Sequence, residues 1–336
     1  MGDHPLGPFA YAPYNPISYK PGGFMNGAGH GNTFQDNYGN YWNTGTPWIA
    51  VNWNFERRIA MFPTGFDKDN QMFANTRFGD FPHYLPTKKW ENKDELFTGW
   101  MLLSYRKPCT ASSTLDTMAA AKTTDENPRT FWVARQNKPG EWLTVDLLKT
   151  SEVRAVQVNF TDYKSDIFEN DPAKTYTTFK LLASQDGKSW QTVADLTQGP
   201  RRDRPCAYVE LPQPVQARYI RYEHSYVRAP SLAVSDLRVF GKIPGKPPKT
   251  PAQLTARRDT DTRNAFISWD KVPGAVGYNI RWGIAPDKLY QTYQIWHDEP
   301  NTLELRALTV GVQYYFAIEA FNESGVSTLS KVTGPI

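Results

Sequence analysis

The stretch GEWLTVDL, residues 140–147, decides the fold class of this chain. From Leu143 onward it alternates apolar and polar residues, which is the two-residue period of a strand with one buried face. The same alternation recurs at 152–158 and 217–222, whereas no long stretch has helical periodicity and a helix fits only residues 90–97. We therefore predict an all-β protein.

Length and composition indicate several globular domains. The chain has 336 residues, and at roughly 100–200 residues per domain this length indicates two or three. Hydrophobic residues make up 40% and charged residues 21%, which is typical of a globular protein. Aromatic residues reach 14%, and both β cores and sugar-binding faces use them. We assign most of these aromatic residues to the core.

Charge and cysteine content exclude several classes of function. The formal net charge of +4 comes from scattered Lys and Arg residues rather than one basic face, so we expect no nucleic-acid partner. The sequence contains no run of about 20 apolar residues, so we expect no membrane span. Cys109 and Cys206 lack the spacing of a zinc or redox motif. They form one disulfide or remain two buried thiols, and the sequence leaves both open.

Two boundaries divide the chain into three segments. Residues 243–251, IPGKPPKTP, hold four prolines and one glycine and predict a short, semi-rigid linker. A softer boundary lies near residue 100, after a polar stretch. The start of the chain, residues 2–9, has turn chemistry and no features of a signal peptide. We expect the natural beginning of the protein to lie upstream.

The last segment, residues 252–336, carries blocks rich in aromatic residues: AFISW at 265–269, GYNIRW at 277–282 and YFAIEAFN at 315–322. With these blocks it resembles a fibronectin type III domain along its whole length. The resemblance implies a β-sandwich in which Trp269 is a buried core residue. It also implies that Tyr314 forms a tyrosine corner, with its hydroxyl bonded to upstream backbone. Such a domain is usually a spacer or an interaction surface, and its fold does not define a function.

The middle segment, residues 103–242, carries a series of short blocks: TASS at 110–113, TDENPRTFW at 124–132, GEWLTVDL at 140–147, SQDGKSW at 184–190, ARYIR at 217–221 and SDLRVFG at 235–241. In this order the blocks resemble those of a discoidin (coagulation-factor C-type) domain, the fold of carbohydrate-binding module family 32. The resemblance implies a single jelly-roll β-sandwich that binds sugars.

One loop of the middle segment collects candidate metal ligands. Asp125, Asn127 and Thr130 bring together hard oxygen atoms, which calcium prefers. In the resembling family this loop holds a structural calcium, closed by an acidic residue near the end of the domain, which is Asp236 here. This chain departs from the family at Asp236, where glutamate is more usual, and at Glu126, where glycine is frequent. The alternative is an Asx-type turn without a metal.

Sugar contacts are expected in loops at one end of the sandwich. An aromatic ring packs against the apolar side of a sugar, and Arg or Glu binds its hydroxyls. The candidates are Tyr163, Phe168 and Glu169 in one loop, with Tyr226 and Arg228 in another. Single aromatic residues in loops are also common without any function.

The first segment, residues 1–100, carries three blocks: GAGHGNTFQDNYGNYW at 27–42, ERRIAMFP at 56–63 and GFDKDNQM at 65–72. With these blocks it looks like the last part of the five-bladed propeller of glycoside hydrolase family 43. The resemblance implies that His30 lies near the propeller axis, where it holds a metal ion or ordered water beneath the sugar site. It implies that Arg58 points into the pocket as an accessory residue. The alternative for His30 is a structural role in a glycine-rich turn.

The chemistry of that family needs residues beyond this segment. Its inverting reaction uses a carboxylate base and a carboxylic acid roughly 6.5–9.5 Å apart. In the family these acids come from earlier blades, so we expect no catalytic residue in this chain and no activity from the chain alone. Asp36, Asp67 and Asp69 suit hairpin turns. The remaining one and a half blades would leave apolar faces uncovered, and we expect the middle segment to cover them.

Three functions follow from these segments. The favoured one is the C-terminal part of a secreted glycoside hydrolase that acts on plant-type or host polysaccharide, with the middle segment binding carbohydrate. The second is a non-catalytic glycan-binding or adhesion protein, and the third is a complete enzyme that uses acids of residues 1–100. The resemblances imply an extracellular, periplasmic or cell-surface location, and we expect a monomer.

Overall fold

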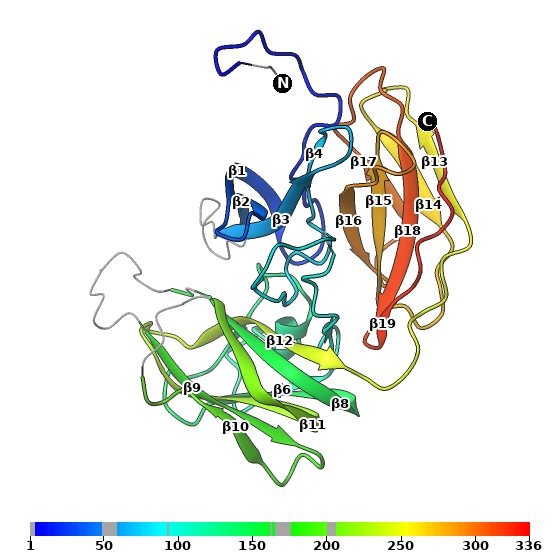
Figure 1. Cartoon of the computed structure of the whole chain (residues 1–336). Helices are drawn as coiled ribbons and strands as arrows, with labels where there is room; N and C mark the ends of the chain where they lie inside the picture. The colour runs from blue at the N-terminus through cyan, green and yellow to red at the C-terminus, as the bar shows by residue number, and fades with distance from the viewer. Residues whose placement is uncertain (1–3, 49–58, 93, 162, 165–175, 200–205) are drawn as a thin grey trace.

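The computed structural model describes residues 4–48, 59–92, 94–161, 163–164, 176–199 and 206–336. In this part of the chain the regular structure consists of strands and a single 3-10 helix, η1 (Ala120–Thr124). The predicted all-β fold class is therefore confirmed. Figure 1 shows three groups of strands, and the chain that follows the first group runs between the other two. No helix of the described residues is long and apolar enough to cross a membrane.

The N-terminal sheet is a four-stranded antiparallel meander in chain order. Asp36 closes the first hairpin because its Oδ1 accepts the backbone N–H groups of Tyr38 and Asn40, both at 2.9 Å. Asp67 closes the last hairpin in the same way. The predicted turn role of these two acids is confirmed. The strands are β1 (Asn26–Gln35), β2 (Tyr41–Trp48), β3 (Ala60–Phe66) and β4 (Met72–Ala74).

The middle sandwich is one connected set of eight strands in the order β10-β9-β11-β8-β12-β5, with β6 on β8 and β7 on β12. The strands β8 and β11 pair in three stretches separated by two register shifts, so both bend and enclose the core. Trp132, Phe160 and Phe179 are among the fully buried core residues. The strands are β5 (Met101–Leu102), β6 (Cys109–Ala111), β7 (Trp132–Val133), β8 (Trp142–Phe160), β9 (Thr177–Ser184), β10 (Gln191–Asp195), β11 (Cys206–Val227) and β12 (Ala233–Lys242).

The C-terminal sandwich packs a three-stranded sheet, β13-β14-β17, on a four-stranded sheet, β16-β15-β18-β19. Trp269 lies in this core and is 3% exposed. The Tyr314 hydroxyl accepts the backbone N–H of Thr309 at 3.1 Å. The predicted positions of these two side chains are confirmed. The strands are β13 (Leu254–Arg258), β14 (Ala265–Trp269), β15 (Gly277–Gly283), β16 (Gln291–Trp296), β17 (Thr302–Leu305), β18 (Tyr315–Asn322) and β19 (Gly325–Val326).

The N-terminal sheet packs chiefly on the C-terminal sandwich. The ring of Phe73 stacks on Tyr290, with centroids 4.7 Å apart. Lys288 pairs with Asp67 at 3.0 Å and with Asp69 at 2.7 Å. We expected the middle segment to cover this sheet. That prediction is wrong, because the C-terminal sandwich makes the main contacts. The reason is that charged and aromatic groups of the loop before β16 match the last hairpin of the sheet.

The connector, residues 75–100, joins all three groups. Phe78 and Phe81 lie in a buried cluster with Phe240 of the middle sandwich and Phe321 of the C-terminal sandwich. Arg77 binds Glu319 of β18 through both Nε (2.5 Å) and Nη2 (3.0 Å).

The proline-rich linker, residues 243–251, also packs closely. The backbone N–H of Ile243 donates to the carbonyl of Glu323, and Asn322 donates to the carbonyl of Lys246. Pro248 is buried. The linker is thus held against the C-terminal sandwich along its length.

Candidate functional site

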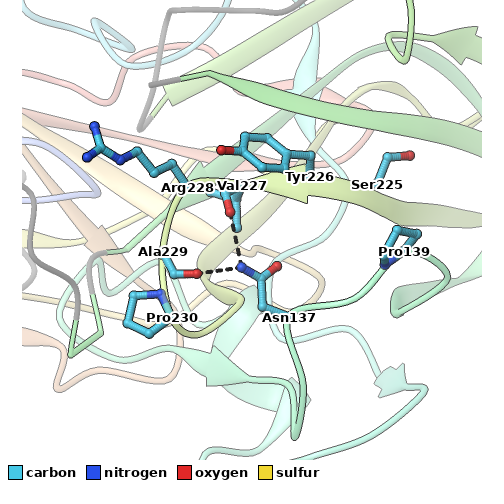
Figure 2. Close-up of a pocket in the computed structure, with 8 residues that line it drawn as sticks. All are labelled: Asn137, Pro139, Ser225, Tyr226, Val227, Arg228, Ala229 and Pro230. Atoms are coloured by element: carbon cyan, nitrogen blue, oxygen red, sulfur yellow. Dashed lines mark hydrogen bonds between the residues drawn. The ribbon is translucent and has the colours of Figure 1, made fainter. Parts of the chain in front are cut away.

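The main candidate site is an open pocket of about 490 Å³ at the end of β11. One wall is the loop that precedes β8, and the other is the end of β11 with the turn that follows it. Figure 2 shows Tyr226 and Arg228 on one side and Asn137 and Pro139 on the other. The residues that line the pocket are Asn137, Pro139, Ser225, Tyr226, Val227, Arg228, Ala229 and Pro230.

Asn137 holds the two walls together. Its Nδ2 donates to the backbone carbonyls of Val227 at 3.0 Å and Ala229 at 2.5 Å (Figure 2). Its Oδ1 therefore faces Nε2 of His224, 2.8 Å away. Because the pocket wall depends on these bonds, Asn137 sets the shape of the turn after β11.

His224 lies behind Asn137 and stays neutral. Its side chain is buried, and Nδ1 lies 2.8 Å from the Tyr222 hydroxyl. Burial lowers the pKa of His224 to about 4. The amide oxygen of Asn137 can only accept, so Nε2 carries the proton and Nδ1 accepts from Tyr222. The hydrogen-bond network behind Asn137 is therefore uncharged at neutral pH.

Tyr226 supplies an aromatic surface to the pocket. Its ring stacks on Tyr176, which immediately precedes the neighbouring strand β9, with centroids 4.5 Å apart and planes 28° apart. The side chain of Tyr226 is partly exposed, as is that of Arg228 two residues later. The pocket therefore combines an oriented ring, a guanidinium and an amide.

The structure brings together two of the five predicted sugar-binding residues. Tyr226 and Arg228 both line the pocket. Tyr163 does not line it, because its ring packs on Phe131 with centroids 5.6 Å apart. Phe168 and Glu169 lie outside the described residues.

Asn137 is the pocket residue that sequence reasoning missed. It stands in the turn-forming run QNKPG, residues 136–140, five positions before β8 begins at Trp142. That position was its only sequence signal. Its contacts to residues 87–92 positions away arise from the fold.

The predicted calcium loop folds around Asp125. Its Oδ2 accepts the hydroxyl of Thr130 at 2.6 Å, and its Oδ1 accepts the backbone N–H of Asn127 at 3.0 Å. Burial raises the pKa of Asp125. These bonds alone make the Asx-type turn that was the alternative to a metal site.

Asp236 supplies the observation that favours a cation. It is fully buried, and within the described chain its Oδ1 has no hydrogen-bond partner. Its pKa is raised well above the usual value, first by burial and then by the nearby charges of Glu126 and Asp125. A buried carboxylate oxygen without a partner fits a hard cation. The described residues nevertheless contain no convergence of three His, Cys, Asp or Glu side chains typical of a metal centre.

Glu126 is built into an ion pair. Its backbone φ is +58°, in the left-handed region where the resembling family often has glycine. Its two carboxylate oxygens accept Nε and Nη2 of Arg238, both at 2.9 Å. Burial raises the pKa of Glu126 to about 7, and the guanidinium acts in the opposite direction. The departure from glycine therefore places a buried carboxylate beside the candidate cation site.

The residues predicted from the propeller resemblance gain no such support. His30 is exposed on β1 with φ of +54°, and the described chain places no set of metal-ligating side chains around it. Arg58 lies outside the described residues. The roles of both stay predictions.

Comparisons with known proteins give a family match for the middle of the chain. Residues 108–226 match the F5/8 type C domain. A search of curated proteins gave no match.

Similar solved structures each match about two fifths of the chain. Chitosan-binding module 1 of a chitosanase/glucanase from Paenibacillus sp. IK-5 is 20% identical, with a TM-score of 0.35, and the match covers 42% of this chain and 99% of that one. The family 32 carbohydrate-binding module of NanJ from C. perfringens, solved with galactose, is 17% identical, with a TM-score of 0.35 and coverage of 42% and 98%. The corresponding module of AlyQ, solved with 4,5-unsaturated mannuronic acid, is 21% identical, with a TM-score of 0.33 and coverage of 42% and 98%. Over residues 108–226, this chain carries an F5/8 type C domain.

Proposed function

We propose that this chain binds carbohydrate in the pocket formed by Asn137, Tyr226 and Arg228. The observation that carries the proposal is the pocket itself. It sets a stacked aromatic ring, a guanidinium and a fixed turn around one open space. The F5/8 type C match of the surrounding residues supports it.

The chemistry of the pocket suits a sugar. The face of Tyr226 offers a flat surface for the C–H groups of a pyranose ring. The Arg228 guanidinium donates hydrogen bonds in a fixed plane, which suits vicinal hydroxyls or a carboxylate. Since Asn137 and the neutral His224 hold the wall, these groups need little reordering when a ligand binds.

The test is binding of the full chain to galactose, chitotriose and a uronic-acid oligosaccharide by calorimetry, followed by a panel of polysaccharides. We expect binding that Tyr226→Ala weakens at least tenfold. Tyr84→Ala is the matched control, because Tyr84 is 53% exposed on the connector, outside this pocket. No binding to any of these ligands, or equal losses in both variants, would contradict the proposal.

A divalent cation fits between the loop of residues 125–130 and Asp236 of β12, and calcium is the best candidate. Asp125, Asn127, Thr130 and Asp236 would hold it through oxygen atoms, and its charge would stabilise the two carboxylates. The test is thermal unfolding with calcium or with a chelator. We expect calcium to raise the Tm of the wild type and to leave that of Asp236→Asn unchanged. A calcium effect that survives in Asp236→Asn would contradict this assignment.

For the whole protein, we infer a secreted glycoside hydrolase of which this chain is the C-terminal part. The meander β1–β4 has the strand number of one propeller blade, and the three-plus-four sandwich suits a fibronectin type III domain. Asp36 and Asp67 serve turns, which supports catalytic acids outside this chain. Hydrolysis of a polysaccharide by this chain alone would contradict that inference. A non-catalytic adhesion protein is the other outcome, supported if the natural upstream sequence encodes no further blades.

A further inference from the structure

Arg238 of β12 lies at the centre of a buried ion-pair network with Glu126, Asp80 and Lys20, which we call the Arg238 junction. Its side chain is 1% exposed. Besides the paired bonds to Glu126, its Nη1 donates to the backbone carbonyl of Asp80 at 2.9 Å and to Oε1 of Gln157 at 3.0 Å. Its Nη2 lies 3.1 Å from Oδ2 of Asp80. Leu237 and Val239 on either side of Arg238 lie in the core of the middle sandwich, so Arg238 and the Asp80 carboxylate meet on the opposite, outer face of β12.

A turn of the N-terminal segment closes this junction. Lys20 is 3% exposed and pairs with Oδ1 of Asp80 at 3.1 Å. The ring of Phe24, 1% exposed, lies under the Arg238 guanidinium, with the carbon of the guanidinium 4.2 Å from the ring centroid. Lys20, Asp80, Arg238 and Glu126 thus form a chain of alternating charges that runs from the N-terminal segment into the F5/8 type C domain.

The C-terminal sandwich packs closely against the same turn at Gly22. A Cβ added to Gly22 would lie 2.3 Å from the backbone carbonyl oxygen of Gln294 in β16. Gly22 also has φ of +154°, which side-chain-bearing residues rarely adopt. The turn is therefore fitted between two sandwiches.

We propose that residues 20–24 and 78–81 form a plug that covers the outer face of β12 in the middle sandwich, so that the F5/8 type C domain of this chain is not an independent folding unit. Without the plug, the ion pair of Arg238 with Glu126 would lose its second carboxylate and its aromatic cover. Breaking a buried ion pair on one side is strongly destabilising because it strands the remaining charge. The plug holds the sugar pocket in one orientation relative to the N-terminal sheet, whereas a flexible tether would let it swing.

The test is hydrogen exchange with mass spectrometry on the full chain, comparing the wild type with Asp80→Asn and Lys20→Met. We expect amides of β8, β11 and β12 to exchange at least tenfold faster in both variants, together with those of β2 and β3. Lys68→Met is the matched control. It removes another lysine of the N-terminal segment, whose pair with Asp287 is 3.2 Å long but lies on the surface. Its exchange should equal that of the wild type.

The opposite pattern would overturn the proposal. In that pattern residues 14–24 and 75–104 lose protection in the variants, while β8, β11 and β12 exchange as in the wild type. If both variants fail to fold, hydrogen exchange of the wild type is measured at increasing urea concentrations instead. A common opening transition of β3 and β8 supports the plug, and a separate transition of the middle sandwich contradicts it.

Discussion

The proposed sugar pocket at the end of β11 and the Arg238 junction share one feature and differ in another. Each places a titratable side chain at the centre of a buried hydrogen-bond network. In the pocket that side chain is His224, kept neutral by burial, and its network ends at a surface open to solvent. In the junction it is Arg238, which stays charged and is covered on all sides. The comparison indicates that the neutral network is free to serve ligand binding, whereas the charged one serves to lock elements together.

The largest effect is expected at the junction. Arg238→Met would leave the carboxylates of Glu126 and Asp80 buried without their shared partner. We expect a loss of about 3–5 kcal/mol in the free energy of unfolding, measured by urea denaturation. Arg263→Met removes an exposed arginine paired with Asp261 and should leave the midpoint unchanged. Equal midpoints for wild type and Arg238→Met would show that the junction is not a lock.

The pocket network should respond to pH instead. The unfolded His224 has a pKa near 6.5, and the folded one about 4. Between these pH values His224 is protonated in the unfolded state and neutral in the native state. The free energy of unfolding therefore falls as the pH falls from about 6.5 to about 4. The loss is on the order of 3 kcal/mol for a shift of this size.

The measurement is the pH dependence of unfolding for the wild type and His224→Gln. The difference between them isolates His224, because Glu126 has a raised pKa and acts in the opposite direction over part of the same range. The wild type should lose stability relative to the variant as the pH falls. Parallel pH profiles would contradict the neutral, buried state of His224.

A smaller loss is expected when the pocket wall is loosened. Asn137→Ala leaves the carbonyls of Val227 and Ala229 without their shared donor. This should lower the free energy of unfolding by about 1–3 kcal/mol and weaken sugar binding as well. Calorimetry and urea denaturation on the same sample separate the two effects. Unchanged sugar affinity would show that the turn holds its shape without Asn137.

The smallest effect is expected at the surface of the N-terminal sheet. Lys68 and Asp287 are paired across two groups of strands, yet their side chains are 74% and 60% exposed. Lys68→Met should change the Tm by less than the scatter of replicate measurements, because exposed ion pairs contribute little. A clear decrease in Tm would show that surface pairs also hold these groups together.

The sequence predicted those features that depend on local pattern. The alternation at 140–147 gave the inward residues of β8. The resemblance of the last segment to a fibronectin type III domain implied the positions of Trp269 and Tyr314. Tyr226 and Arg228 were candidates because the discoidin resemblance places sugar contacts in loops at one end of the sandwich. These inferences needed only short blocks of neighbouring residues and the order of those blocks.

The features that the sequence did not predict depend on contacts between distant positions. Arg238 meets Asp80 across 158 positions, and Arg77 meets Glu319 across 242. No local pattern marks such partners, since a buried and an exposed arginine look alike in a sequence. For the same reason the linker at 243–251 was predicted as a semi-rigid spacer, although packing holds it in place.

The most direct test of the account is calorimetric titration of the full chain with its best polysaccharide ligand, for the wild type and Tyr226→Ala side by side. We predict saturable binding to the wild type and an affinity at least tenfold lower for Tyr226→Ala, with both proteins equally stable. Binding of equal strength to the two proteins would contradict the assignment of the carbohydrate site to this pocket.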